Sequence, residues 1–315
     1  MPGGGVAVAG TPPALDTPVA FIVFNRPEPT RRVFEAIRAA RPATLLVIAD
    51  GARAGRDGEA ERVAAVRALV ADVDWPCRVL TNFAAVNMGC GARVSSGLDW
   101  VFAQVDCAIV LEDDCLPSPS FFRFCETMLG MYRDDRRIYA VSGSNFSGAT
   151  TGAGHYYSDY ALMWGWATWA DRWADYRFAA PDAAAVITTK WWRNPVKYLY
   201  WQRIFGKLNR GQIDTWDYQW LLTLWRNGAV AVRPPVNLVQ NIGFGADATH
   251  TSVADTPLAA MRAVTTDADF TAADGPVQAD RACDRHDDRE WALLNWRSVA
   301  LMYFPWLSRS KWQRR

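Results

Sequence analysis

The chain has 315 residues, half of them apolar, which is enough for one large α/β domain or two smaller ones. Its 34 Lys and Arg nearly balance its 33 Asp and Glu. No global positive field recruits nucleic acid, so nucleic acid is not an expected partner and any anion site has to be local. The six cysteines form no C-x-x-C pair, which is typical of thiols in a reducing compartment.

The start of the chain is rich in Gly, Pro and Ala and lacks the basic and apolar regions of a secretory signal. This composition predicts a disordered lead-in over residues 1–17. No stretch reaches the roughly 18 uninterrupted apolar residues of a membrane span. We therefore expect a cytoplasmic protein, and the inner face of the membrane stays open as its location.

Residues 18–146 alternate apolar runs with amphipathic stretches, a pattern that predicts a parallel sheet with crossover helices. The expected strands are PVAFIVFN, ATLLVIAD, CRVLTNF, CAIVLEDD and IYAVSGSNF. Three of them end on polar residues, namely Asn25, Asp50 and the acid triplet Glu112, Asp113 and Asp114. Because ligands of open α/β sheets bind beyond the carboxyl ends of the strands, we expect these side chains to meet in one crevice.

The second half of the chain is rich in aromatic residues. YYSDYALMWGWATWADRWADY predicts a strand, a tight turn at Gly165 and then a helix. DTWDYQWLLTLWRNG predicts a helix capped by Asp214 or Thr215, and the strand AVAVRPPVNLVQNIGFG follows. Residues 252–289 lack periodicity and are expected to form an extended arm. The aromatic and basic segment 291–315 suits either an anionic membrane surface or a helix docked on the domain.

The acid triplet is the first candidate for chemistry. An apolar strand that delivers adjacent carboxylates to the edge of a sheet suits a hard divalent cation such as Mg²⁺ or Mn²⁺. The alternative is a solvated loop that caps the helix starting near Ser118. A second candidate is the turn NMGCGARV, where Arg93 and free backbone N–H groups of a helix start could face an anion, unless it is an ordinary glycine-containing connection. The chain has neither a Walker loop nor G-x-G-x-x-G, which disfavours ATPases and dinucleotide enzymes.

Two residues of the second half are further candidates. Asp217 lies in the expected first turn of a helix, where the dipole keeps a carboxylate ionised and suited to act as a general base for a sugar hydroxyl, with Trp216 beside it to exclude water. A capping acid is the competing interpretation. His250, in a glycine-rich loop with Asp247, could complete a metal shell or bind a diphosphate, although a lone loop histidine often does neither.

Taken in order, eight segments resemble nucleotide-sugar glycosyltransferases of the GT-A fold, in particular the inverting N-acetylglucosaminyltransferase I type and related bacterial enzymes. The segments are FNRPE, IADGAR, ARVSSGLDWVF, VLEDDCLPSPSFF, VSGSNF, LMWGWATW, TWDYQW and NIGFGADATHT. The resemblance implies a Rossmann-like α/β fold with a mostly parallel central sheet flanked by helices. It spans residues 18–251, with a nucleotide-sugar half (18–146) and an acceptor half (147–251), and leaves 252–315 as a C-terminal extension.

The resemblance also implies a role for each candidate residue. It implies Asp114 and His250 as metal ligands, Asn25, Arg26, Asp50, Arg93, Glu112 and Asp113 as donor-binding residues, Asp217 as the catalytic base, and Trp164, Gly165, Trp166 and Trp216 as the sugar and acceptor surface. The implied reaction is an inverting transfer from a nucleoside diphosphate sugar, UDP being the first expectation, to a hydroxyl of a bacterial glycan or glycolipid, with Mn²⁺ or Mg²⁺. A non-catalytic carbohydrate-binding protein and a metal-dependent nucleotide-sugar hydrolase remain alternatives. The membrane anchor and disulfides of the Golgi enzymes are not recognisable, so their compartment and acceptor are not transferred.

Overall fold

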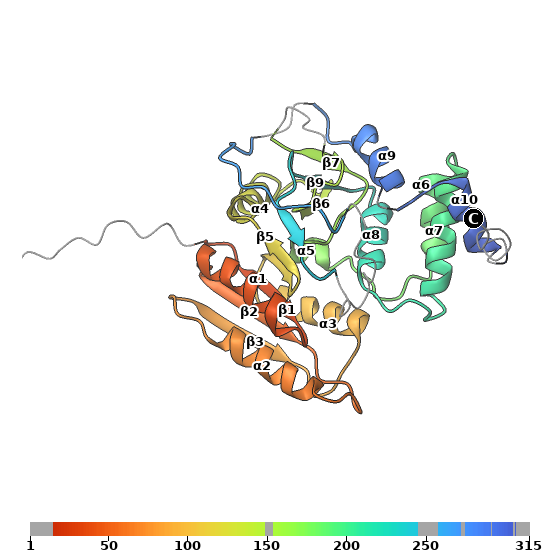
Figure 1. Ribbon diagram of the computed structural model, residues 1–315. Coiled ribbons are helices and arrows are strands. Elements are labelled where there is room, and N and C mark those ends of the chain that lie inside the picture. The colour runs from red at the N-terminus through yellow and green to blue at the C-terminus, as the bar shows by residue number, and fades with distance from the viewer. Residues whose placement is uncertain are drawn as a thin grey trace, which may run out of the picture.

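A computed structural model describes residues 15–148, 154–244, 258–271, 275–290, 292–304 and 306. The described residues form an α/β domain with a mostly parallel central sheet flanked by helices, as the sequence predicts (Figure 1). The sheet is mixed and has eight strands in the order β3-β2-β1-β4-β8-β6-β9-β7. The strands of this sheet are β1 (Val19–Val23), β2 (Thr44–Ala49), β3 (Arg78–Phe83), β4 (Cys107–Glu112), β6 (Ile138–Ser142), β7 (Tyr156–Ser158), β8 (Trp166–Trp169) and β9 (Val230–Arg233). A separate antiparallel pair consists of β5 (Cys115–Pro117) and β10 (Val239–Asn241).

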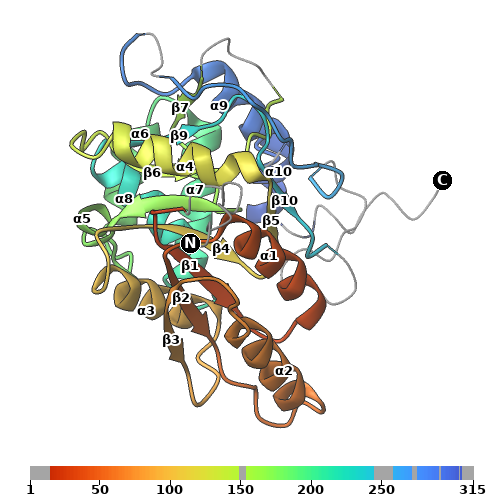
Figure 2. The same ribbon diagram turned by 90° about the vertical axis from the view of Figure 1, so that its left-hand side faces the viewer.

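The helices cover both faces of the sheet. They are α1 (Pro27–Ala40), α2 (Glu59–Ala71), α3 (Cys90–Phe102), α4 (Pro119–Met131), α5 (Ala170–Trp173), α6 (Ala183–Trp191), α7 (Pro195–Leu208), α8 (Asp217–Arg226), α9 (Arg281–Glu290) and α10 (Trp296–Tyr303). Alternate residues of each central strand point to opposite faces, so Phe21 packs in one core cluster and Ala20 in the other. Helices α1, α2 and α4 cover the first cluster, and α3, α7 and α8 cover the second. Figure 2 shows β1–β3 between α3 on one side and α1 and α2 on the other.

Strand β8 is the main departure from the predicted arrangement. Strands β3, β2, β1 and β4 are parallel, whereas β8 runs antiparallel between β4 and β6. The predicted turn at Gly165 is present, with φ of +63°, but a strand and not a helix follows it directly. The prediction was wrong because β4 and β6 each offer an edge of unpaired backbone groups, and the segment Trp166–Trp169 satisfies both.

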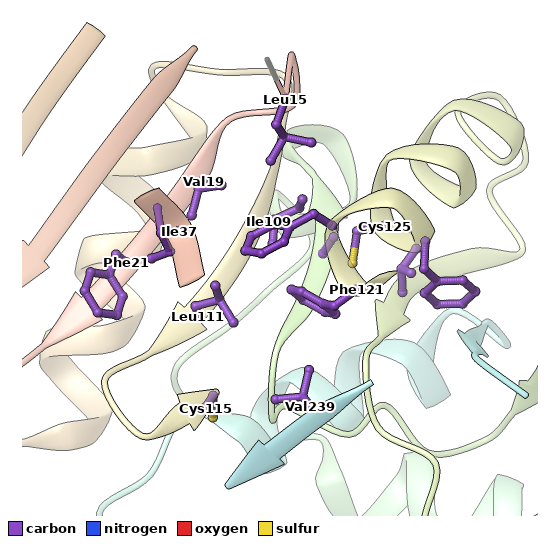
Figure 3. Close-up of a cluster of buried hydrophobic side chains, with 14 of the residues drawn as sticks. Leu15, Val19, Phe21, Ile37, Ile109, Leu111, Cys115, Phe121, Cys125 and Val239 are labelled. Atoms are coloured by element: carbon purple, nitrogen blue, oxygen red, sulfur yellow. The ribbon is translucent and has the colours of Figure 1, made fainter. Parts of the chain in front are cut away.

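The apolar cluster next to the acid triplet is shown in Figure 3. Ile109 and Leu111 of β4 point into it, and Phe121 of α4 and Val239 of β10 lie on its other side. Cys115 follows the triplet and is almost completely buried in the same cluster. The chain on both sides of the triplet is therefore fixed by apolar packing, which holds its carboxylates in place at the edge of the sheet.

Both ends of the described chain pack on the domain in segments that were predicted to be a disordered lead-in and an extended arm. Leu15 is buried and Thr17 donates a hydrogen bond of 3.0 Å to Glu126, so the predicted lead-in is wrong from residue 15 onwards. Helix α9 lies where an extended arm is predicted. It docks through three buried acids: Asp284 accepts from Ser158, Asp287 pairs with Arg233, and Asp288 accepts from Tyr160 and Lys197. In the part of the chain that the structure describes, no helix is long and apolar enough to span a bilayer.

Candidate active site

A cavity of about 660 Å³ lies at the carboxyl ends of β1, β2 and β4. The segment that leads into α8 and the segment before β8 close it from the other side. The predicted site residues in its wall are Arg26, Asp50, Arg93, Glu112, Asp113, Asp114, Trp164, Trp216 and Asp217. The predicted convergence of polar strand ends on one crevice is therefore confirmed for Asp50 and the acid triplet but not for Asn25, which is absent from the described cavity wall.

The acid triplet and Arg26 form one wall of the cavity. Glu112 is the last residue of β4 and pairs with Ile22 of β1, so the two acids that follow project beyond the sheet. Arg26 lies beyond β1, at the start of α1, and its guanidinium contacts Asp113 and, at 3.1 Å, Asp114. Asp113 also accepts a hydrogen bond of 3.3 Å from the backbone of Phe24. One arginine thus lies between two of the three carboxylates.

The electrostatics of this wall show a shortage of positive charge. Burial, followed by the charges of Asp114, Asp113 and Asp217, raises the pKa of Glu112 to about 8. Burial also raises the pKa of Asp113 to about 6, although the charge of Arg26 opposes that shift. Both raised pKa values mean that ionising these carboxyl groups costs free energy. A bound cation would lower that cost.

Asp50 organises the loop that follows β3. Its carboxylate accepts hydrogen bonds from the amide of Asn87 at 2.9 Å, and from the backbone N–H groups of Met88 at 2.9 Å and Gly89 at 3.2 Å. It also accepts from the N–H of Gly51 at 2.8 Å. The structure thus gives Asp50 a positioning function in the cavity wall, while its implied contact with a nucleotide stays a prediction.

Arg93 is placed in the first turn of α3, as predicted, but its guanidinium turns toward the sheet. It donates to the carbonyl of Ala49 at 3.2 Å and to the side chain of Asn82 at 2.8 Å, which ties the ends of β2 and β3 together. The side chain is 5 % exposed and reaches the cavity wall. Any contact that Arg93 makes with a ligand would come in addition to this structural role.

Asp214 was proposed as a cap of α8, but it occupies the N-terminus of α3. Its two carboxylate oxygens accept from the backbone N–H groups of Cys90 at 3.0 Å and Gly91 at 2.9 Å. A Cβ on Gly91 would lie 2.7 Å from the same carboxylate, so the glycine permits this approach. The N–H groups that the sequence analysis offers to an anion are therefore taken by the chain itself. Sequence reasoning missed this pairing because its partners are 123 residues apart.

Asp217 lines the same cavity as the triplet. It is the first residue of α8, whose N-cap is Trp216 and not one of the two residues proposed from the sequence. Its carboxylate accepts from the hydroxyl of Thr215 and from the backbone N–H of Tyr218 at 2.9 Å. After burial and the charges of Asp114 and Asp113, the charge of Asp217 contributes to the raised pKa of Glu112, so the two carboxylates interact electrostatically within one cavity.

The predicted sugar and acceptor surface divides into cavity wall and core. Trp164 lines the cavity and packs edge-on against Phe146, which also lines it. Trp216 is 2 % exposed and stacks on Trp166 at 5.5 Å between ring centroids. Trp166 itself is completely buried in β8, and neither it nor Gly165 lies in the described cavity wall. These two residues therefore support the wall rather than form it.

Two further predicted residues lie elsewhere. The side chain of Asn25 donates to Glu59 at 3.0 Å and is absent from the described cavity wall. His250 lies outside the described residues. Conversely, Arg53 lines the cavity although the sequence analysis did not single it out. Its guanidinium pairs with Glu59 and lies 5.5 Å from the ring centroid of Phe24. The motif IADGAR contains Arg53, but nothing in the motif shows which way the side chain turns.

Comparisons with known proteins show a distant likeness of structure. No protein-family model and no curated protein matches the chain. Similar solved structures include a UDP-glucose pyrophosphorylase complexed with UDP-glucose (9 % identity, 51 % of this chain and 78 % of that one, TM-score 0.28). The 4-diphosphocytidyl-2C-methyl-D-erythritol synthase of Anaerococcus prevotii is also similar (10 % identity, 51 % of this chain and 74 % of that one, TM-score 0.32). So is a mannose-1-phosphate geranyltransferase of Thermus thermophilus (11 % identity, 71 % of this chain and 75 % of that one, TM-score 0.34). At these identities and TM-scores the likeness says nothing about the reaction.

Proposed function

We propose that the protein is a metal-dependent inverting glycosyltransferase. It would move a sugar from a nucleoside diphosphate, with UDP the first donor to test, to a hydroxyl of a glycan or lipid-linked glycan. The observation that supports this most is that one cavity holds the acid triplet at the end of β4 and Asp217 at the start of α8. Such a transfer needs negative groups that grip a cation on the leaving side and a separate base on the acceptor side.

The residues present fit a hard cation that is shared with the donor. No three side chains of metal-ligating type converge within the described part of the chain. Asp114 would therefore supply one carboxylate, and phosphate oxygens and water the other positions, as is usual for Mg²⁺. Gly243 passes so close that a Cβ there would lie 2.2 Å from Asp114, so the chain that follows β10 runs beside the triplet at this residue. When bound, the cation would stabilise the negative charge of the departing diphosphate.

The chain's own residues would carry the proton transfer. Asp217 would take the proton of the acceptor hydroxyl while the hydroxyl oxygen bonds to the anomeric carbon and the bond to the diphosphate oxygen breaks. Thr215 and the N–H of Tyr218 hold this carboxylate in one orientation, which a positioned base requires. The configuration would invert because Asp217 would direct the hydroxyl to the face of the sugar opposite the departing diphosphate.

The apolar part of the wall suits the face of a sugar ring. Trp164, Phe146 and Met163 line the cavity between the triplet and the start of α8. Aromatic rings stack on the C–H face of a sugar, while the carboxylates around them accept hydrogen bonds from its hydroxyl groups. In this arrangement the carboxylates would orient the sugar, and the aromatic rings would add affinity.

The proposal is tested by donor binding and transfer. Thermal-shift screening of nucleoside diphosphates and their sugars, with and without Mn²⁺, should find a ligand that stabilises the protein when metal is present. Transfer with that donor should stop in EDTA and resume when Mn²⁺ is added. Metal-independent transfer would overturn the proposed role of the triplet. Release of free sugar without an acceptor would indicate a hydrolase. Sugar binding without turnover would indicate a non-catalytic binding protein.

A further inference from the structure

All exposed tryptophans among the described residues lie in one part of the molecule. Trp192, between α6 and α7, is 63 % exposed, and Trp296 and Trp306, at the two ends of the α10 region, are 59 % and 63 % exposed. Leu293 and Phe304 beside them are exposed as well. Indole rings left in water at these helix ends form an apolar surface that no described residue covers.

The same part of the molecule carries a local excess of positive charge. Residues 183–211, which include α6 and α7, contain six Lys and Arg and no acid, and residues 291–315 contain five and no acid. All 33 acids and the other 23 basic residues lie elsewhere. The net charge of the whole chain is near zero because two basic segments offset an acidic remainder.

Contacts between helices join the two segments into one surface. Helix α10 packs on α7, where the hydroxyl of Tyr303 donates to the carbonyl of Leu199 at 3.0 Å and the guanidinium of Arg203 lies 5.5 Å from the Tyr303 ring centroid. Figure 1 shows α6, α7 and α10 together at one end of the molecule. We call the exposed side of these three helices, with residues 192–194, 293, 304 and 306, the basic aromatic surface.

Most cations of this surface have no internal counter-ion. Lys190 pairs with Asp159 and Lys197 with Asp288, which fixes α6 and α7 to the domain. The other cations of the described segments have no carboxylate partner within the described residues; they are Arg193, Arg203, Lys207, Arg210 and Arg297. Charges without a partner next to exposed indoles point to an occupant that is both anionic and partly apolar.

We propose that the basic aromatic surface binds the anionic face of a lipid bilayer. Indole rings are stable at the headgroup level of a membrane, and each Lys or Arg near an anionic leaflet adds about 1 kcal/mol. A soluble polyanion would meet the charges but leave the indoles in water. The two sequence alternatives for residues 291–315 are then compatible, because α10 docks on α7 through Val299 and Tyr303 and presents Trp296 and Arg297 outward.

Co-sedimentation of the full chain with vesicles tests this proposal independently of catalysis. The protein should pellet with vesicles of equal parts phosphatidylcholine and phosphatidylglycerol, far less with phosphatidylcholine alone, and less at high salt. The triple variant Arg193→Gln, Lys207→Gln, Arg210→Gln should bind about 100-fold more weakly. The control triple variant Arg56→Gln, Arg62→Gln, Arg78→Gln removes the same charge from exposed positions near α2 and should bind like the wild type.

A second pair of variants tests the indoles. The first variant combines Trp192→Ser, Trp296→Ser and Trp306→Ser; it keeps every charge and should no longer pellet with the vesicles. The control variant combines Val79→Ser, Val86→Ser and Met131→Ser at exposed apolar positions elsewhere and should pellet like the wild type. Melting curves check that each variant is folded. Equal pelleting with neutral and anionic vesicles, unchanged binding in the triple variants, or binding to polygalacturonate in place of vesicles would overturn the proposal.

Discussion

Replacement of Arg26 by glutamine tests how the acid triplet is held together. The guanidinium of Arg26 contacts Asp113 and Asp114, and their charges raise the pKa of Arg26 although burial opposes it. Glutamine keeps much of the side-chain volume and removes the charge. The variant therefore leaves two nearly buried carboxylates next to each other without their arginine partner.

The expected loss follows from the burial of the pair. The side chains of Asp113 and Asp114 are 5 % and 13 % exposed, and that of Arg26 is 21 % exposed. Removing one partner of a buried ion pair costs about 3–5 kcal/mol, and the partial exposure of Arg26 places this case near the lower end, about 3 kcal/mol. With an unfolding entropy of about 2.1 cal/mol/K per residue, this loss lowers the Tm of a 315-residue chain by about 4–5 °C.

Thermal melts at neutral pH with and without Mn²⁺ measure this effect. Mn²⁺ should raise the Tm of Arg26→Gln more than that of the wild type, because the cation then supplies the charge that the arginine supplied. Arg31→Gln is the matched control, since Arg31 pairs with Glu28 on the exposed side of the same helix and should cost less than about 1 kcal/mol. An Arg26→Gln protein with the Tm and the Mn²⁺ response of the wild type would refute the reasoning.

Three further predictions concern other carboxylates. Asp217→Asn should keep donor binding and lower turnover by about 10²–10⁴-fold, and comparable turnover would remove Asp217 from its proposed role as base. Asp214→Ala should lower the free energy of unfolding by about 1–2 kcal/mol in urea melts, because the first N–H groups of α3 lose their cap, and unchanged stability would contradict that role. Burial raises the pKa of Asp284 from 3.8 to about 7, so its stabilising contribution is present at acidic pH and lost as the pH rises through 7. Asp284→Asn should flatten the fall in Tm between pH 4 and 7, and an equally steep fall would show that other groups cause it.

The sequence was sufficient for the features that depend on local pattern. Apolar runs of five or six residues predicted the parallel strands β1, β2 and β4, because a strand buried on both faces needs apolar residues throughout. The polar residues after those runs predicted the crevice, because parallel strands bring their carboxyl ends to one edge. Asp50 and the acid triplet reach the cavity for this reason.

Features that depend on distant partners were not predictable in this way. Strand β8 forms because two neighbouring strands leave their edges open, which the sequence of β8 does not reveal. Helix α9 lies mostly in a stretch that was predicted to be an extended arm. It docks because its carboxylates bind Arg233, Lys197 and Ser158, which lie far from it in the sequence. Buried polar pairs carry no periodicity, so pattern reasoning cannot find them.

The position of Asp214 indicates how the two halves of the cavity stay aligned. Its carboxylate fastens the segment before α8 to the N-terminus of α3, and Asp217 follows it by three residues. Thr215, between them, donates to Asp217, so the orientation of the proposed base depends on a segment that is fixed to α3. Burial first, and then the charges of Glu112, Asp214 and Asp217, raise the pKa of the Cys90 thiol to about 12, as expected where both walls meet. A shift of α3 would therefore move Asp217 relative to the triplet, so in the proposed transfer this contact, rather than either half alone, would set the distance between base and leaving group.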